Sequence, residues 1–248
     1  MPELAGLRCL VTGSARGIGR EIARAFAREG ADLVILDIRI EQARDTAAEL
    51  EQFGQRTLAV AADVSSETQV RDAIEQAERA FDGIDVLVNN AGIIDTAPVA
   101  DMPTEMWDRM IAVNLRGVFL CTRAVLPGMT ERGFGRIINI SSQLGHKGAP
   151  NMAHYAAAKS AIIGFTRSLA REVCADGVLV NAICPGAVAT DLGGDIPEDL
   201  RARRLAEIPL GRFGQAAEIA PTAVLLAGPG GSFYVGATMN LNGGDVMV

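Results

Sequence analysis

The stretch Thr12-Gly13-Ser14-Ala15-Arg16-Gly17-Ile18-Gly19 follows an apolar run at residues 7–12 and leads directly into a helical pattern at Gly17–Arg28. The apolar run predicts a buried strand, so the glycines form the turn between a first strand and a first helix. Glycine permits a tight turn and lets backbone N–H groups approach a diphosphate at the positive end of a helix. The spacing is G-x-x-x-G-x-G rather than the common G-x-G-x-x-G, so this turn alone is weak evidence for a dinucleotide site.

Strand-like and helical stretches alternate along the rest of the chain, with no linker and no repeat of fixed period. The predicted strands are residues 7–12, 33–36, 57–61, 86–88, 136–140, 178–183 and 238–241, and the predicted helices are 17–28, 41–52, 67–81, 104–130, 152–174 and 216–226. This alternation predicts one α/β domain over residues 1–248, a doubly wound, parallel, seven-stranded sheet of Rossmann type with helices on both faces. Residues 191–210 are the least regular piece and are predicted to form a lid over a site.

Composition excludes several classes of protein. With 248 residues, 49% hydrophobic residues and a net charge of −7, the chain is predicted to fold and not to bind nucleic acid, which demands a basic face. Residues 219–244 carry no charge but contain two prolines and six glycines, which predicts buried core rather than a membrane span. No basic region precedes an apolar stretch at the N-terminus, so no signal peptide is expected.

The four cysteines lie far apart and show neither metal-ligand spacing nor a CxxC pair. They are predicted to be buried, reduced thiols in a cytoplasmic protein without a metal site.

Asp37 ends the second predicted strand, 20 residues beyond Gly17, where an acid can hydrogen-bond the diol of an adenosine ribose. Its charge would repel a 2′-phosphate and therefore favours NAD over NADP. Arg16 argues for NADP, because a guanidinium beside the second glycine can grip that phosphate, and Arg39 can do the same or pair with Asp37. Asp37 carries more weight, so NAD is the preferred cofactor and NADP remains possible.

Tyr155 and Lys159 stand four positions apart on a predicted helix, so both side chains lie on one face. An ammonium about 4 Å away, at an effective dielectric constant of about 20, favours the phenolate by roughly 4 kcal/mol. That would lower the tyrosine pKa by about three, into the range useful for general acid/base catalysis. Lys159 is the only charge between residues 156 and 166, which predicts a helix that is buried nearly all round.

Ser142 follows the strand at residues 136–140, at the carboxyl edge of the sheet where ligands gather, and Ser141 is the neighbouring candidate. A hydroxyl there can hold a substrate oxygen and stabilise developing charge. Of the two histidines, His154 is adjacent to Tyr155 and so points elsewhere on the helix. His146, in the loop after Ser142, is a candidate for contact with the substrate.

Five motifs occur in order: Thr12-Gly13-x-x-x-Gly17-x-Gly19, Asn89-Asn90-Ala91-Gly92, Ser142, Tyr155-x-x-x-Lys159 and Pro185-Gly186. Together they resemble the short-chain dehydrogenase/reductase family, nicotinamide-dependent oxidoreductases with a single Rossmann domain, over residues 7–244. The resemblance implies Tyr155 as general acid/base, Lys159 on the nicotinamide ribose, Ser142 on the substrate oxygen and Asn114 on a water that links Lys159 to solvent. It also implies a set of cofactor contacts at successive strand ends: Gly13, Arg16, Gly17, Ile18, Gly19, Asp37, Asp63, Val64, Asn90, Ala91, Gly92, Tyr155, Lys159, Pro185, Gly186, Val188 and Thr190.

The implied reaction interconverts a secondary alcohol and a ketone by hydride transfer, on a small alcohol, polyol, sugar or hydroxy acid. The substrate pocket is predicted from residues 93–95, 143–148, Ala187 and the 191–210 excursion. The chain also resembles 3-oxoacyl-ACP reductases, which commonly use NADPH. Against that assignment, Gly133 and Asp176 occupy the expected docking positions for an acidic carrier protein, although Arg132 and Arg136 are nearby.

An enoyl reductase and a nicotinamide-sensing Rossmann binding protein are both disfavoured. The interval from Tyr155 to Lys159 differs from that of enoyl reductases, and a sensing protein would be expected to lose part of the Ser–Tyr–Lys set. Helices 104–130 and 152–174 are apolar on more faces than one core can cover, which predicts self-association. Because the family is often tetrameric, a homotetramer is expected, with no nucleic-acid or membrane partner.

Overall fold

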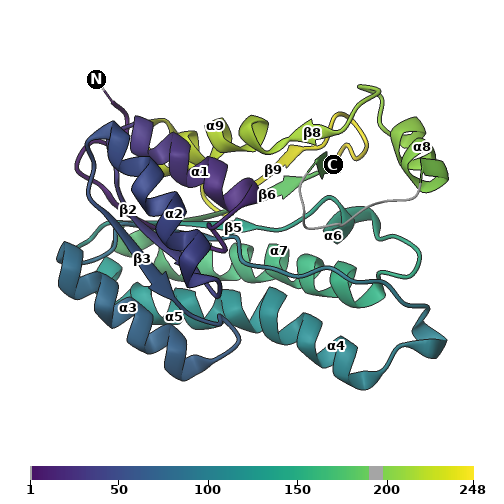
Figure 1. Ribbon diagram of the computed structural model, residues 1–248, viewed down its shortest axis with the longest axis horizontal. Helices are drawn as coiled ribbons and strands as arrows, with labels where there is room; N and C mark the ends of the chain where they lie inside the picture. The colour runs from purple at the N-terminus through teal and green to yellow at the C-terminus, as the bar shows by residue number, and fades with distance from the viewer. Residues whose placement is uncertain (1, 190–197) are drawn as a thin grey trace.

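The computed structural model describes residues 2–189 and 198–248, with side chains from residue 201 onward in the second segment. Seven parallel strands form one sheet in the order β3-β2-β1-β4-β5-β6-β9 (Figure 1). The strands are β1 (Arg8–Thr12), β2 (Asp32–Asp37), β3 (Thr57–Ala61), β4 (Val86–Asn89), β5 (Gly135–Ile140), β6 (Val178–Pro185) and β9 (Thr238–Leu241). The predicted doubly wound α/β fold is confirmed.

Helices cover both faces of the sheet and bury one hydrophobic cluster on each (Figure 1). One face carries α1 (Gly17–Arg28), α2 (Ile40–Leu50) and α9 (Ala216–Ala227). The other carries α3 (Glu67–Phe81), α5 (Gly117–Glu131) and α7 (Ala153–Val173). Successive residues of β1 alternate between the two clusters, as the two-residue period of a strand requires.

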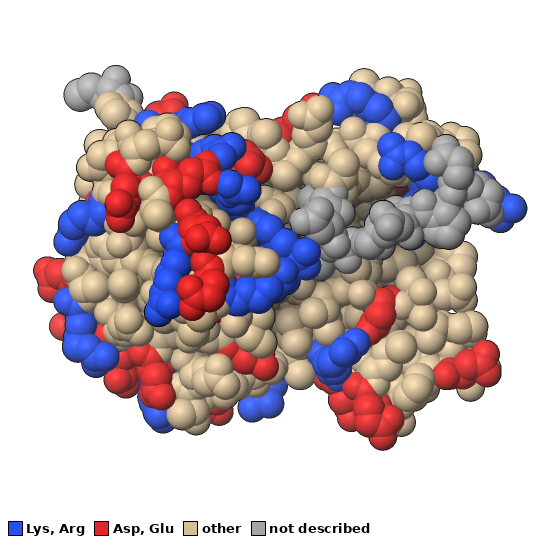
Figure 2. Space-filling view, in the orientation of Figure 1, with Lys and Arg blue, Asp and Glu red and all other residues tan. Residues whose placement is uncertain are grey.

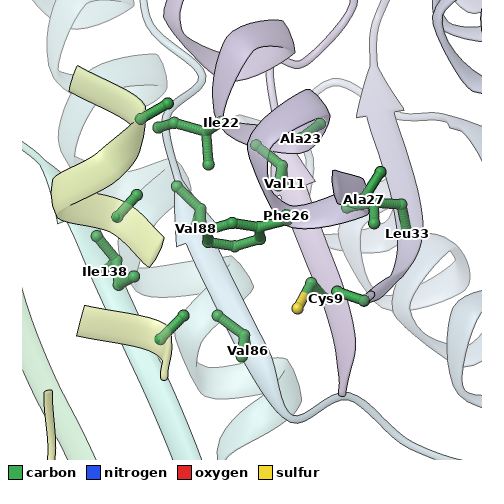
Figure 3. Close-up of a cluster of buried hydrophobic side chains, with 14 of the residues drawn as sticks. Cys9, Val11, Ile22, Ala23, Phe26, Ala27, Leu33, Val86, Val88 and Ile138 are labelled. Carbon is green, nitrogen blue, oxygen red and sulfur yellow. The ribbon is translucent and has the colours of Figure 1, made fainter. Parts of the chain in front are cut away.

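Phe26 of α1 shows how the first cluster is assembled. Its ring is fully buried and lies between α1 and the side chains of Val11 on β1 and Val88 on β4 (Figure 3). Full burial of such a side chain contributes about 2–3 kcal/mol to stability. This packing fixes α1, and with it the glycine turn that precedes it, against the middle of the sheet.

The strand order reverses between β1 and β4, because the chain runs outward from β1 to β3 and then returns to pair β4 with β1. The carboxyl ends of these two strands border a crevice of the kind in which open α/β sheets bind ligands.

The predicted helix at 104–130 is interrupted. It consists of α4 (Thr104–Ile111), a π-helical turn at Ala112–Arg116, and α5. By length and apolarity this stretch could cross a bilayer, but 44% of its most apolar window is buried inside the protein, and core helices pass the same test.

Several short elements have no counterpart in the sequence prediction. They are α6 (Leu144–Lys147), α8 (Glu198–Glu207), a two-stranded ribbon of β7 (Val188–Ala189) and β8 (Gly214–Gln215), and 3₁₀ turns at Glu51–Phe53, Val99–Asp101, Cys174–Asp176 and Pro229–Gly231. The predicted lid at 191–210 lies partly outside the described residues, since only residues 198–210 of it are described, with α8 as their main element.

Three predictions of burial were wrong in part. Residues 219–244 contribute Ile219 and Leu226 to the core, but the turn before β9 leaves Phe233 100% exposed. The helix that carries Tyr155 is buried on one face only, and small residues such as Ala161 and Gly164 are exposed on its outer face. Of the four cysteines, Cys174 is exposed and the other three are buried.

Positive and negative side chains are interspersed over the face shown in Figure 2, and no continuous basic surface covers it. On α1 and α2, for example, Arg20 and Arg24 both pair with Glu49. Among residues 2–189 and 198–248, no group of three or more His, Cys, Asp or Glu side chains is placed to hold a metal ion.

Candidate active site

The loops that follow β1 and β4 are joined by hydrogen bonds at the switch point. Thr12 Oγ1 accepts from the backbone N–H groups of Asn90 and Ala91 at 3.0 Å each. The side-chain Nδ2 of Asn90 donates to the carbonyl oxygens of Thr12 and Gly13 at 3.0 and 2.9 Å. A Cβ atom on Gly13 would lie 2.7 Å from Ala91 Cα, and its φ is +63°, so glycine is required for this close approach.

A cavity opens directly above this junction. Its walls come from the glycine turn and from the ends of β2, β3 and β4, and they contain ten of the residues predicted to bind the cofactor. These ten are Gly13, Arg16, Gly17, Ile18, Asp37, Asp63, Val64, Asn90, Ala91 and Gly92. The walls also include Leu36, Ile38, Arg39, Ala62, Ile93 and Val113.

Gly19, also predicted as a cofactor residue, does not line this cavity. A Cβ atom there would lie 2.4 Å from the carbonyl oxygen of Gly13 and 2.5 Å from Asn90 Nδ2. Gly19 therefore permits helix α1 to pack against the glycine turn and the loop after β4.

Asp37 lies at the cavity wall and is 6% exposed. Its two carboxylate oxygens accept from backbone N–H groups, Oδ2 from Ala15 at 3.1 Å and Oδ1 from Arg39 at 3.0 Å. Arg39 Nε also lies 4.0 Å from Oδ1, so the predicted pairing of Arg39 with Asp37 is present. The carboxylate is thereby held in a fixed position beside the cavity.

The cavity fits an adenine dinucleotide by its chemistry. The glycine turn at the start of α1 suits a diphosphate, the fixed Asp37 carboxylate suits a ribose diol, and Val64 with Ala62 gives an apolar wall for an adenine ring.

Ser142, Tyr155 and Lys159 lie together beyond the ends of β5 and β6, and all three are less than 9% exposed. Tyr155 forms a hydrogen bond with Ser142, and Lys159 Nζ lies 5.6 Å from the centroid of the Tyr155 ring. The Lys159 ammonium also donates to the carbonyl oxygen of Ile140 at 2.8 Å. Ser141, the neighbouring candidate, is engaged elsewhere, because its hydroxyl donates to the backbone carbonyl of Lys159 at 2.7 Å.

The predicted lowering of the tyrosine pKa was wrong for the protein on its own. Burial raises the pKa of Tyr155 to about 12, and the hydrogen bond with Ser142 only partly offsets that effect. Burial also lowers the pKa of Lys159 to about 8. Desolvation outweighs the attraction between the two side chains, because the lysine is directed to Ile140 and lies over the ring.

Asn114 lies in the π-helical turn, and such turns often occur at functional sites. Its amide nitrogen donates to the carbonyl oxygens of Ile93 and Met110 at 3.1 and 3.2 Å. Its Oδ1 atom is buried with no partner among the described residues, and a Cβ atom on Gly92 would lie 2.7 Å from it. An acceptor left in this way suits the water contact that the family resemblance implies.

Pro185 ends β6, and Gly186 and Val188 follow it, but none of the three lines the described cavity; Thr190 lies outside the described residues. The Pro185 carbonyl accepts from the Gln143 N–H at 2.9 Å, which places this segment beside the loop that carries Ser142.

One side-chain cluster was not predicted from the sequence. Gln143 Nε2 donates to Asp245 Oδ2 at 2.5 Å, and Lys147 bridges the other Asp245 oxygen and Glu207, the latter at 3.2 Å. Burial lowers the pKa of Lys147, but its hydrogen bonds to Asp245 and Glu207 outweigh that effect, so the pKa is raised overall. The loop after Ser142 is thus tied to α8 and to the C-terminal segment, over sequence separations of 60 to 102 residues that no local pattern reveals.

Of the two histidines, His146 lies in α6 with its Nε2 atom buried and without a partner among the described residues, so its contact with the substrate stays a prediction. His154 is fully buried and contacts Asp95, a pairing that the sequence also did not indicate.

The cavity at the switch point and the Ser–Tyr–Lys group beside it define a class, the nicotinamide-dependent oxidoreductases of Rossmann fold. A family model described as enoyl-(acyl carrier protein) reductase matches residues 13–245. The chain belongs to the short-chain dehydrogenase/reductase family, as its motifs indicated.

Relatives cover the whole chain. A 3-oxoacyl-[acyl-carrier-protein] reductase from Thermotoga maritima is 38% identical over 245 residues, which are 99% of this chain and 100% of that protein. A 2-(S)-hydroxypropyl-CoM dehydrogenase from Xanthobacter autotrophicus is 40% identical over 94% of each chain. The solved structure of a 3-oxoacyl-[acyl-carrier protein] reductase with bound NAD from Brucella melitensis has a TM-score of 0.93 and 38% identity, over 100% of this chain and 94% of that one.

Proposed function

We propose that this protein interconverts a secondary alcohol and a ketone, with Tyr155 as general acid/base. The observation that carries the proposal is the buried Tyr155 hydroxyl, hydrogen-bonded to Ser142 beside the Lys159 ammonium at the carboxyl edge of the sheet. A nicotinamide cofactor, when bound, accepts or supplies the hydride. The walls that would hold it are those of the switch-point cavity, and Pro185, Gly186, Val188 and Thr190 are proposed for its nicotinamide end.

In the reducing direction Tyr155 donates its proton to the carbonyl oxygen of the substrate. A pKa of about 12 keeps that proton on the phenol at neutral pH, as an acid requires. Ser142 holds the same oxygen. Lys159 has a pKa of about 8 and is therefore mostly charged at neutral pH, and it stabilises the phenolate that the proton transfer leaves. Asn114 would connect Lys159 to solvent through water and so restore the proton.

We propose NAD as the preferred cofactor, because the Asp37 carboxylate is fixed at the cavity wall and would meet a 2′-phosphate. Arg16 and Arg39 line the same cavity, which keeps NADP possible.

For the substrate we propose a small alcohol, polyol, sugar or hydroxy acid. The arginines nearest the expected carrier-docking positions are engaged elsewhere. Arg132 donates to the Ile84 carbonyl at 2.5 Å, and Arg136 is 8% exposed and stacked 4.6 Å from the centroid of the Phe134 ring. The second candidate is a 3-oxoacyl-ACP reductase, which the names of the Thermotoga and Brucella relatives favour.

A spectrophotometric screen at 340 nm tests the proposal. NAD(H) and NADP(H) are offered separately with secondary alcohols, polyols, hydroxy acids, acetoacetyl-CoA and an acetoacetyl carrier protein. Turnover of small compounds with NAD(H) is expected. Strong preference for the carrier-bound thioester with NADPH would favour the second candidate, and inactivity with every pair would support a nicotinamide-sensing protein.

The Tyr155→Phe variant tests the assignment of the acid. Turnover should fall by at least 10³-fold, as expected for loss of the proton donor, while the Kd for the cofactor stays within about threefold. Substantial activity in this variant would remove Tyr155 from the mechanism.

We also propose a homotetramer. Trp107 and Phe119 on the α4–α5 stretch are 40% and 42% exposed, and Phe233 is fully exposed on another part of the surface. Sedimentation at micromolar concentration should show an assembly, and a monomer would contradict this.

A further inference from the structure

A chain of three charged or titratable side chains runs beside the catalytic tyrosine. His154, the residue before Tyr155, is 0% exposed, and its Nε2 atom lies 2.6 Å from Asp95 Oδ1. Asp95 Oδ2 in turn accepts from Arg109 of α4 at 2.7 Å. The proposed mechanism uses none of these residues.

Asp95 belongs to the segment at residues 93–98, an irregular part of the connection between β4 and α4 that precedes the 3₁₀ turn at Val99–Asp101. Two further hydrogen bonds hold this segment. Asn114 Nδ2 donates to the Ile93 carbonyl at 3.1 Å, and the Ala97 N–H donates to the Asn151 carbonyl at 2.9 Å. Between these two bonds, the contact of Asp95 with His154 ties the middle of the segment to α7.

The same segment forms part of the wall around Tyr155. Ile93 and Ile94 pack against a cluster of Met110, Met152 and Tyr155. A displacement of residues 93–98 would therefore change the space beside the reacting hydroxyl.

The first turn of α7 depends on such tertiary contacts. Its N-cap residue, Met152, makes no side-chain capping bond, and the turn contains no acidic residue. Tyr155 is the third residue of this helix, so its side chain moves with the first turn. The Asp95 carboxylate, brought by His154, supplies a negative charge near a helix start that has none of its own.

We propose that His154 and Asp95 form a positioning pair, which holds segment 93–98 at a fixed distance from the first turn of α7 and so sets the width of the substrate site beside Tyr155. The proposal rests on the proposed role of Tyr155. His154 acts through Asp95 and carries no proton of the reaction. A proton on Nε2, donated to Asp95, leaves a bare lone pair at the buried Nδ1, which costs less than an unpaired N–H there.

Two amide substitutions separate the pairing from simple packing. In His154→Gln the side-chain nitrogen occupies about the place of imidazole Nε2, so it can still donate to Asp95. In His154→Asn the amide ends near the place of Nδ1 and cannot reach. Arg109→Gln is the outer control, because Arg109 is 65% exposed and its loss leaves the buried pair intact.

Hydrogen exchange gives a readout that needs no substrate. In His154→Asn the peptide containing the Ala97 N–H is expected to exchange at least tenfold faster, while peptides of the glycine turn are unchanged. His154→Gln should restore protection to within about threefold, and Arg109→Gln should match the parent protein. Unchanged exchange of this peptide in His154→Asn would overturn the proposal.

Kinetics with acetoacetyl-CoA and the preferred cofactor provide the second readout. His154→Asn should raise KM about tenfold with a smaller fall in kcat and an unchanged cofactor Kd, and Asp95→Ala should add little to it, because the two residues act as a unit. If the effects of His154→Asn and Asp95→Ala on KM were additive, or if stability fell while KM stayed unchanged, the two residues would contribute only to packing. If Tyr155→Phe is inactive while His154→Asn is normal, the positioning proposal fails alone; an active Tyr155→Phe overturns the function instead.

Discussion

Two kinds of contact hold the active-site edge in place, and close packing at a glycine occurs in both of its halves, as also at Gly186, where a Cβ atom would lie 2.6 Å from Asn242 Cα. In the cofactor half, residues 8–94, the backbone of a few glycines packs at distances that no side chain tolerates, as at Gly13 and Gly19. In the catalytic half, residues 135–248, side chains far apart in sequence pair across loops, as Lys147 does with Glu207 and Asp245. Close packing at a glycine restricts which residue can stand at one position. A side-chain pair requires two matching residues at positions far apart in the sequence.

The largest expected effect breaks the backbone packing of the cofactor half. In Gly19→Ala the new Cβ would lie 2.4 Å from the Gly13 carbonyl oxygen, so the turn must shift. We expect the free energy of unfolding to fall by about 2–3 kcal/mol and the cofactor Kd to rise at least tenfold. Urea unfolding and calorimetric titration measure both.

Gly214→Ala, in the catalytic half, is the matched control. The nearest atom to its new Cβ would be Val188 Cγ2 at 3.6 Å, an ordinary contact, so the change should cost less than about 1 kcal/mol. Equal losses in the two variants would show that the close approach at Gly19 does not set the cost of an added Cβ atom.

The next effect concerns the Asp37 carboxylate of the cofactor half. Asp37→Asn keeps an acceptor oxygen for one of the two backbone N–H groups and removes the charge that repels a 2′-phosphate. With Arg16 and Arg39 still in the cavity wall, the ratio of kcat/KM for NADP to that for NAD should rise at least tenfold.

Asp63→Asn removes another carboxylate from the same cavity and should leave that ratio within about threefold. A ratio that is insensitive to Asp37→Asn would mean that the arginines alone decide the cofactor.

These contrasts follow what the sequence could and could not predict. The glycine turn, Asp37 and the Tyr155–Lys159 spacing are local patterns, and their placement at one sheet edge follows from the parallel alternation of strands and helices. The pairing of Gln143 with Asp245 joins residues 102 positions apart, and nothing local marks it. The direction of the Tyr155 pKa was wrong because the prediction counted the charge of Lys159 but not the cost of desolvating the phenolate.

The third effect belongs to the catalytic half and appears as a dependence of stability on pH. Folding lowers the pKa of Lys159 from 10.5 to about 8, so the unfolded chain binds more protons than the folded one above pH 8. Stability from this group is therefore gained as pH rises and lost as pH falls through 8. Between pH 7 and 9 the gain is about 1 kcal/mol.

Lys159→Met should remove that gain, so the difference in unfolding free energy between the two cofactor-free proteins should change by about 1 kcal/mol from pH 7 to 9. The raised pKa values of the buried Cys9 and Cys121 lower stability at higher pH in both proteins, and they cancel in the difference because neither depends on Lys159. A difference that is flat over this range would contradict the lowered lysine pKa.

The smallest expected effects are those of the paired side chains in the catalytic half, where the effect on KM should increase with the burial of the contact. The Asp245 side chain is 7% exposed and holds both Gln143 and Lys147, whereas the Glu207 side chain is 63% exposed and pairs with Lys147. An exposed ion pair contributes about 0–1 kcal/mol to stability. Removing the charge from a buried carboxylate that accepts two hydrogen bonds costs more than breaking such a pair. With acetoacetyl-CoA, Asp245→Asn should therefore raise KM about tenfold, Lys147→Met about threefold and Glu207→Gln less than twofold, with the cofactor Kd unchanged in each. The reverse order would mean that the exposed contact with α8, rather than the buried contact with the C-terminal segment, holds the loop after Ser142 in place.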